Sequence, residues 1–144
     1  MNDFLIDKNL YCIDDVAEER NKEKFINFFY LLDYWMQAIE EGKEISLFFL
    51  KRDYNNIAIY GMGILGVHLK KQLEKNNYRV CYTIDKNIIE YNNVKYDLHR
   101  DMNCVPKVDV IVITPIMEYK QIKEELEKIS DVPIISLEEV VLSL

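Results

Sequence analysis

The stretch Ile57-Ala-Ile-Tyr-Gly-Met-Gly-Ile-Leu-Gly66 decides the fold class of this chain. Its first four residues form a short apolar run of β type, and the glycines that follow have the spacing G-x-G-x-x-G. Residues Ile64–Lys75 then carry leucines at helical spacing, which predicts a helix. A strand, a glycine turn and a helix in this order are typical of the first unit of a nucleotide-binding α/β domain.

The elements after this unit continue to alternate. Arg79–Ile84 has the alternation of a strand, and the continuous β-branched run Val110–Ile113 is typical of a strand buried on both faces of a parallel sheet. We expect a helix to open at Thr114-Pro115, a last strand at Pro133–Ser136 and a final helix capped by Ser136-Leu-Glu-Glu139. Residues 85–107 look irregular, with a short strand at Val94–Tyr96. The predicted fold is α/β, with a Rossmann-like parallel sheet of four or five strands.

Residues 1–52 are predicted to form an N-terminal helical extension, and residues 53–144 the Rossmann-like domain. The extension should hold a long helix from Asp15 to Glu41 and a shorter one over Glu44–Lys51, separated by Gly42-Lys43. Apolar residues recur along the long helix at heptad-like spacing and indicate a homodimer seam. Alternatively, the second helix and the N-terminal arm cover this face within one chain. The seam residues are Phe25, Phe29, Leu32, Met36 and Ile39.

The three glycines have separate expected roles. Gly61 permits a tight turn, Gly63 lets backbone N–H groups approach a phosphate, and Gly66 lets the helix pack close to the strand. The helix N-terminus offers unpaired N–H groups and partial positive charge to an anion. The alternative is that the glycines serve only packing, in a domain that has lost its ligand. The predicted site is the backbone of Gly61, Met62, Gly63, Ile64, Leu65 and Gly66.

Three polar residues follow strands and could complete a cofactor site. Asp85 ends the second strand, where a carboxylate would accept from ribose hydroxyls and repel a 2′-phosphate. Lys86 follows it and could contact ribose or phosphate. Thr114 lies at the carboxyl end of the central strand. Turn formation explains Asp85 and Lys86 equally well, and capping of the next helix explains Thr114.

The sequence holds no convincing catalytic set. Tyr119–Lys123 and Tyr91–Lys95 both match Y-x-x-x-K, a pattern in which lysine activates a tyrosine base, but Pro106 stands where the serine partner would be expected. Tyr119 is also needed on the buried face of its helix. His99 and Asp101 lie in a polar stretch that reads as a surface turn. We therefore predict no turnover by this chain alone.

Composition narrows the function classes further. The net charge is −7 without a basic cluster, which argues against binding to nucleic acid or to an anionic membrane. No apolar run reaches the roughly 20 residues of a membrane helix. The three cysteines form no CxxC motif, and the two histidines lack zinc-ligand spacing. A cytoplasmic protein with reduced thiols is the expectation.

Four strings resemble the small Rossmann-like domains of bacterial capsule and cell-surface polysaccharide biosynthesis proteins, which are similar to the N-terminal domain of sugar acyltransferases. The resemblance implies a nucleotide or nucleotide-sugar ligand, NAD being the other expected cofactor, and a glycosyltransferase as a possible partner. A small NAD-dependent oxidoreductase or epimerase subunit, and an oligomerisation module with a vestigial site, are the alternatives. The strings are Ile57-Ala-Ile-Tyr-Gly-Met-Gly, Ile84-Asp-Lys-Asn, Val108-Asp-Val-Ile-Val-Ile-Thr and Ile134-Ile-Ser-Leu-Glu-Glu.

Overall fold

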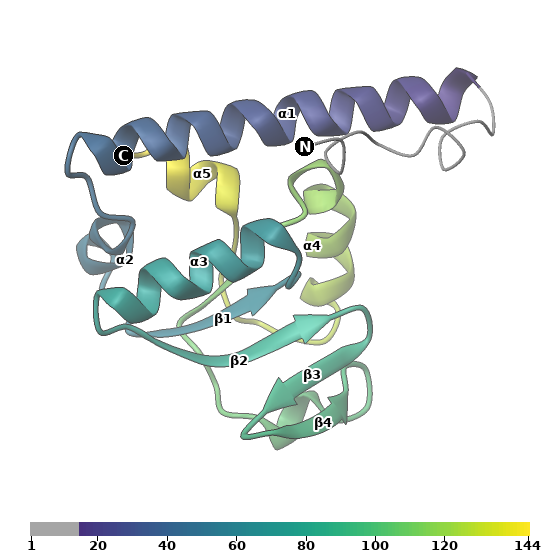
Figure 1. The fold of residues 1–144 in the computed structure, drawn as a ribbon. Coiled ribbons are helices and arrows are strands. Elements are labelled where there is room, and N and C mark those ends of the chain that lie inside the picture. The colour runs from purple at the N-terminus through teal and green to yellow at the C-terminus, as the bar shows by residue number, and fades with distance from the viewer. Residues whose placement is uncertain (1–14) are drawn as a thin grey trace.

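The computed structural model describes residues 15–144 (Figure 1), so the expected N-terminal arm and Cys12 lie outside the described residues. The described helices are α1 (Asp15–Glu40), α2 (Ser46–Lys51), α3 (Ile64–Lys75), α4 (Tyr119–Glu127) and α5 (Leu137–Leu142). The strands are β1 (Asn56–Tyr60), β2 (Arg79–Asp85), β3 (Ile88–Tyr91), β4 (Val94–Asp97), β5 (Val110–Ile113) and β6 (Ile134–Ser136). Two 3₁₀ turns complete them, η3 (Met102–Cys104) and η4 (Ile116–Glu118).

The strands form a single mixed sheet in the order β4-β3-β2-β1-β5-β6. β1 pairs in parallel with β2 on one side and with β5 on the other, and β5 pairs in parallel with β6. The four parallel strands match the prediction, including the central positions of β1 and β5. The strand after β1 in the chain, β2, lies on one side of β1, and β5 lies on the other side. The direction in which strands are added to the sheet therefore reverses at β1, and its carboxyl end is the switch point of the sheet.

The predicted all-parallel sheet of four or five strands was wrong in one respect. Residues 88–97 form the antiparallel hairpin β3–β4, and β3 pairs antiparallel with β2, so the sheet has six strands and is not a classic Rossmann sheet. Asn92 and Asn93 both have positive φ, at 51° and 62°, as a two-residue hairpin turn of primed type requires. The expected strand at Val94–Tyr96 is therefore present, but its partner strand was missed.

Helices cover both faces of the sheet (Figure 1). On one face, side chains of β1 and β5 pack with α3, α5, α2 and the core-facing side of α1. On the other face, the alternate side chains of the same strands pack with Leu126 of α4 and with Leu98 and Val108 from the segment after β4. The N-terminal helices thus share one apolar core with the sheet.

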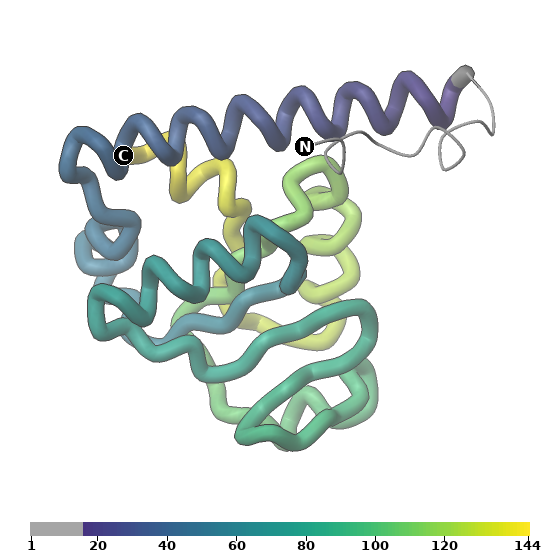
Figure 2. The backbone as a smooth tube through the Cα atoms, in the orientation of Figure 1, coloured from purple at the N-terminus to yellow at the C-terminus, as the bar shows by residue number. Residues whose placement is uncertain are grey.

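The long helix α1 buries one side in the core of the chain and leaves most of the predicted dimer seam exposed. Leu31, Trp35 and Ala38 are its buried residues, at 5%, 3% and 4% exposure. Phe25, Phe29, Met36 and Ile39 of the predicted seam are exposed, and Leu32 packs partly against the core. α5 lies along α1, so the last helix of the chain returns to the first (Figure 2). Within residues 15–144, no helix has the length and apolarity needed to span a membrane.

Candidate functional site

The turn between β1 and α3 is held in place by hydrogen bonds from both neighbouring strands. The N–H of Gly61 donates to the carbonyl of Ile84 at the end of β2, at 2.7 Å. The hydroxyl of Thr114, which follows β5, donates to the carbonyl oxygen of Gly61 at 2.7 Å and lies 3.1 Å from that of Tyr60. The glycine turn is therefore fixed relative to the carboxyl ends of three parallel strands.

Gly61 and Gly66 are required by the packing of the chain on itself. Gly61 has φ +94°, and a Cβ there would lie 2.5 Å from Thr114 Oγ1 and 2.6 Å from Pro115 Cδ. A Cβ on Gly66 would overlap the carbonyl oxygen of Gly61. These two glycines let α3 begin directly above the end of β1, as the sequence predicted.

Gly63 is different, because no described atom lies within 4 Å of the Cβ position that it lacks. It is exposed, has φ −75°, and occupies the N-cap of α3. No side chain of the described residues caps this helix. The first N–H to bond back along the helix is that of Val67, to Gly63, so the N–H groups of residues 64–66 have no partner within α3.

A pocket of about 210 Å³ opens in front of this turn. It brings together seven of the nine predicted site residues: Gly61, Met62, Gly63, Ile64, Leu65, Asp85 and Thr114. Gly66 lies buried behind the turn, where it packs against Gly61. Lys86 does not line the pocket; it is exposed in the β2–β3 turn with φ 58°.

Asp85 and Thr114 differ in their availability to a ligand. Asp85 is exposed at the carboxyl end of β2 and borders the pocket. Thr114 is 3% exposed, and its hydroxyl hydrogen is directed to backbone carbonyls rather than to the pocket. Nor does Thr114 cap the following helical turn, whose N-cap is Pro115. Its observed role is to tie β5 to the glycine turn.

The rest of the pocket comes from two elements that the sequence did not single out. Lys24 and Phe28, one turn apart on α1, line it from one side, and Pro115 and η4 line it from another. Lys24 Nζ lies 3.7 Å from Glu118 Oε1, and both side chains are about half exposed. Nearby, Asn27 Nδ2 donates to Met117 Sδ at 3.3 Å. These contacts join α1 to η4 beside the glycine turn.

The two Y-x-x-x-K strings do not form a catalytic pair. The hydroxyl of Tyr119 donates to the backbone carbonyl of Ile134 at 3.3 Å, and Lys123 Nζ lies over the ring face, 5.8 Å from its centroid. Tyr91 packs against the core next to the sheet, whereas Lys95 is exposed. Both tyrosines have a packing role, which the sequence predicted for Tyr119.

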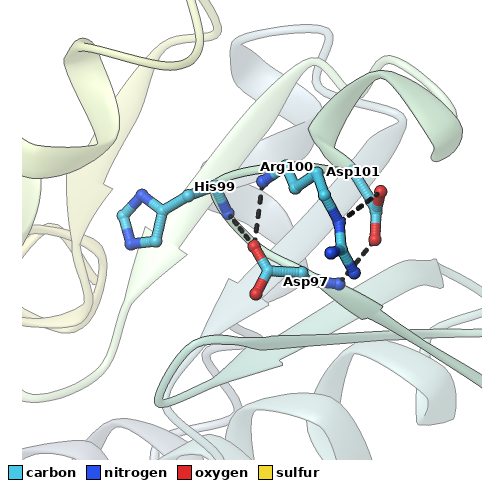
Figure 3. Close-up of polar contacts among 4 residues, drawn as sticks. All are labelled: Asp97, His99, Arg100 and Asp101. Atoms are coloured by element: carbon cyan, nitrogen blue, oxygen red, sulfur yellow. Dashed lines mark hydrogen bonds and ion pairs between the residues drawn. The ribbon is translucent and has the colours of Figure 1, made fainter.

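His99 and Asp101 also remain separate (Figure 3). The carboxylate of Asp97 accepts from the backbone N–H groups of His99 and Arg100, at 3.0 and 2.9 Å. Asp101 accepts from the N–H of Asp97 at 3.0 Å and pairs with Arg100 Nε at 3.5 Å, while the imidazole of His99 points away. This is a polar surface turn. Across residues 15–144, no group of three or more His, Cys, Asp or Glu side chains could hold a metal ion.

Burial alters the acidity of two tyrosines on the sheet. It raises the pKa of Tyr82 in β2 to about 12, and the neighbouring Cys81 adds to the effect. Burial also raises the pKa of Tyr60 at the end of β1, with smaller contributions from the negative charges of Glu125 and Asp85. Both phenols are therefore neutral at physiological pH, and neither is poised to act as a base.

Comparison with known proteins identifies no relative: no family model matches the chain, and no match was found among curated proteins or solved structures.

Proposed function

We propose that this chain is a nucleotide-binding module, whose pocket takes the phosphate of a nucleotide or nucleotide-sugar at the N-terminus of α3. The observation that supports this most is the difference among the three glycines. Gly61 and Gly66 are needed for packing, but Gly63 meets no described atom. A glycine without a packing reason, beside free helix N–H groups, suits the close approach of an anion.

The position of the pocket in the fold supports the same proposal. Ligands of open α/β sheets bind outside the carboxyl ends of the strands, where the strand order reverses. The pocket lies at that edge, and Asp85 provides a carboxylate at the end of β2 for ribose hydroxyls. A negative charge there favours NAD over NADP if the ligand is a dinucleotide. The resemblance seen in the sequence favours a nucleotide-sugar used in bacterial surface polysaccharide synthesis, with a glycosyltransferase as partner.

Titration of the purified protein tests this proposal. Isothermal calorimetry with NAD, NADP, a UDP-sugar and coenzyme A should give saturable binding of at least one of them. Replacement of Gly63 by valine should remove that binding. If none of the four binds at millimolar concentration, the glycine turn serves packing alone and the proposal is wrong.

We further propose that the module is a homodimer through the exposed side of α1. Phe29 and Met36, both in the predicted seam, are 63% and 54% exposed. Large apolar residues at heptad spacing on one exposed helix side are typical of a helix–helix interface. An antiparallel pair centred between Leu32 and Asp33 would place Phe29 against Met36 of a second copy.

A further inference from the structure

The charged side chains around the pocket are unusual for a simple phosphate site. Among the lining residues that the structure describes, Lys24 is the one cation, whereas Asp85 and Glu118 are both acidic. An inorganic anion would gain from Lys24 and the helix N-terminus but would be repelled by two carboxylates. A ligand suited to all of these groups carries a phosphate and also hydrogen-bond donors.

The contact between Lys24 and Glu118 leaves both groups able to bind something else. Their 3.7 Å separation exceeds the roughly 2.7–2.9 Å of a charge-assisted hydrogen bond. The side chains are 52% and 44% exposed, and exposed ion pairs contribute little stability. A phosphate entering the pocket can therefore draw Lys24 away from Glu118 at small cost.

Within the described residues, the second carboxylate oxygen of Glu118 lacks a hydrogen-bond donor, which a ligand could supply. Oε2 is buried, yet it accepts no hydrogen bond from the described part of the chain. A buried acceptor without a hydrogen-bond donor is unfavourable, and more so when it is charged. Glu118 lines the pocket and its side chain is partly exposed, so a rotation of the carboxylate would bring this oxygen to an N–H or O–H group of a ligand and remove that cost.

We propose that Lys24 and Glu118 are the ligand-selecting pair of this pocket. Lys24 binds the phosphate, and Glu118 accepts a hydrogen bond from a hydroxyl or amino group of the same molecule. The ligand class is accordingly a nucleoside phosphate, with inorganic phosphate or pyrophosphate selected against. This inference rests on the proposed nucleotide site and adds the residues of α1 and η4 that determine its selectivity.

The test compares ligands that share a diphosphate and differ in hydrogen-bond donors. NAD contains an ADP moiety, and UDP-sugars contain a UDP moiety. ADP, UDP and inorganic pyrophosphate are each titrated by calorimetry. The wild-type protein should bind one of the nucleotides at least tenfold more tightly than pyrophosphate. Glu118→Gln keeps the shape of the side chain but removes the charge, so this ratio should fall about tenfold.

Lys24→Met should change the affinities in a different way from Glu118→Gln. It should weaken the binding of nucleotide and pyrophosphate together by about tenfold and leave their ratio unchanged. The matched control is Lys22→Met, on the same helix, where the lysine pairs with Glu18 and Glu19 outside the pocket. This control loses the same charge and should leave every affinity within twofold of wild type.

The outcomes separate the two proposals. An unchanged ratio in Glu118→Gln, or unchanged affinities in Lys24→Met, overturns the selecting pair while nucleotide binding itself stands. If Lys22→Met weakens binding as much as Lys24→Met, the effect is one of net charge and the pair is again overturned. If the wild-type chain binds neither ADP nor UDP, the proposed nucleotide site is wrong and this inference falls with it.

Discussion

At the scale of single residues, the three glycines of the turn differ in whether the fold requires them. Gly61 and Gly66 leave space for Thr114, Pro115 and the carbonyl of Gly61, all parts of the chain itself. Gly63 lines the pocket, and a Cβ there would meet no described atom within 4 Å. The same motif thus holds two glycines that the fold requires and one that the fold does not.

We predict that Gly63→Val keeps the fold and loses the ligand. Valine can adopt the φ of −75° found at this position, and its Cβ meets no described atom within 4 Å. The free energy of unfolding should change by less than about 1 kcal/mol, since the helix has no side-chain cap to lose. The added side chain occupies the space proposed for the phosphate, so affinity in calorimetry should fall at least tenfold.

Gly66→Ala is the control for this experiment. Its Cβ would overlap the carbonyl oxygen of Gly61, so α3 must shift away from β1. We expect a loss of about 1–3 kcal/mol in urea unfolding, as for other overpacked sites. Equal stability of the two variants, or unchanged affinity in Gly63→Val, would contradict the division of roles among the glycines.

Tyr82 should make stability depend on alkaline pH. Burial raises its pKa in the folded protein to about 12, whereas an unfolded chain has a tyrosine pKa near 10. The unfolded state therefore loses the proton first as the pH rises. The stabilisation is complete below about pH 10 and is lost as the pH approaches 12, by about 2–3 kcal/mol in total.

Tyr82→Phe removes this titration. Urea unfolding at pH 8 and pH 11 should show a smaller decrease in stability for the variant than for wild type. At pH 8 the two proteins should differ only by the effect of the lost hydroxyl. The same decrease in both proteins would mean that Tyr82 does not contribute to the alkaline loss.

At the scale of secondary-structure elements, the last helix depends on its cap. Ser136 Oγ accepts from the backbone N–H of Glu138 at 3.2 Å, and Ser136 is 8% exposed. Ser136→Ala should lower the free energy of unfolding by about 1 kcal/mol, because an N-cap hydrogen bond is lost. Ser143→Ala is a matched control at the other end of α5, where the hydroxyl donates to the carbonyl of Val140. A larger loss in the control, measured by urea unfolding, would contradict the capping role.

Elements with strong local patterns could be predicted from the sequence. The helix Ile64–Lys75 was predicted with the bounds that the structure has, and β1 and β5 were placed correctly as the central pair of the four parallel strands. The hairpin β3–β4 was missed, although two consecutive asparagines, a residue type that tolerates positive φ, separate Ile88–Tyr91 from Val94–Asp97. The turn between β2 and β3 also carries no glycine signal in the sequence, because Lys86 takes the positive φ at which glycine would be expected.

The candidate site was predictable only where one local motif supplies it. The glycine turn and Asp85 follow consecutive strands, so the spacing of the parallel strands brings them to one edge. Lys24 and Glu118 come from α1 and η4, which meet only through the tertiary packing of the chain. No local pattern around Lys24 distinguishes it from Lys22, which lies outside the pocket.

At the scale of the whole molecule, α1 connects the core, the pocket and the exposed seam. Leu31 and Trp35 anchor it in the core, and Lys24 and Phe28 line the pocket. Its sequence could not indicate which apolar side faces the core, since residues 28, 31, 35 and 38 repeat with nearly the same spacing as the seam. The seam is therefore the apolar side of α1 that stays exposed when the other apolar side packs in the core.

We predict that this exposed side makes the chain a dimer. Light scattering after size-exclusion chromatography should give twice the monomer mass of 17.2 kDa at micromolar concentration. Phe29→Glu and Met36→Glu each place a charge in the apolar seam and should shift the protein to monomer. Because both side chains are more than half exposed, circular dichroism and urea unfolding of the monomer should show the fold retained.

The matched control for the dimer is Val16→Glu. Val16 is 69% exposed on the same helix, similar to Phe29, but it lies nine residues before the first residue of the seam. A charge there should leave the dimer intact, so that a general rise in surface charge cannot account for dissociation. A monomeric wild-type protein contradicts the proposal, and equal dissociation by Val16→Glu contradicts the assignment of the seam.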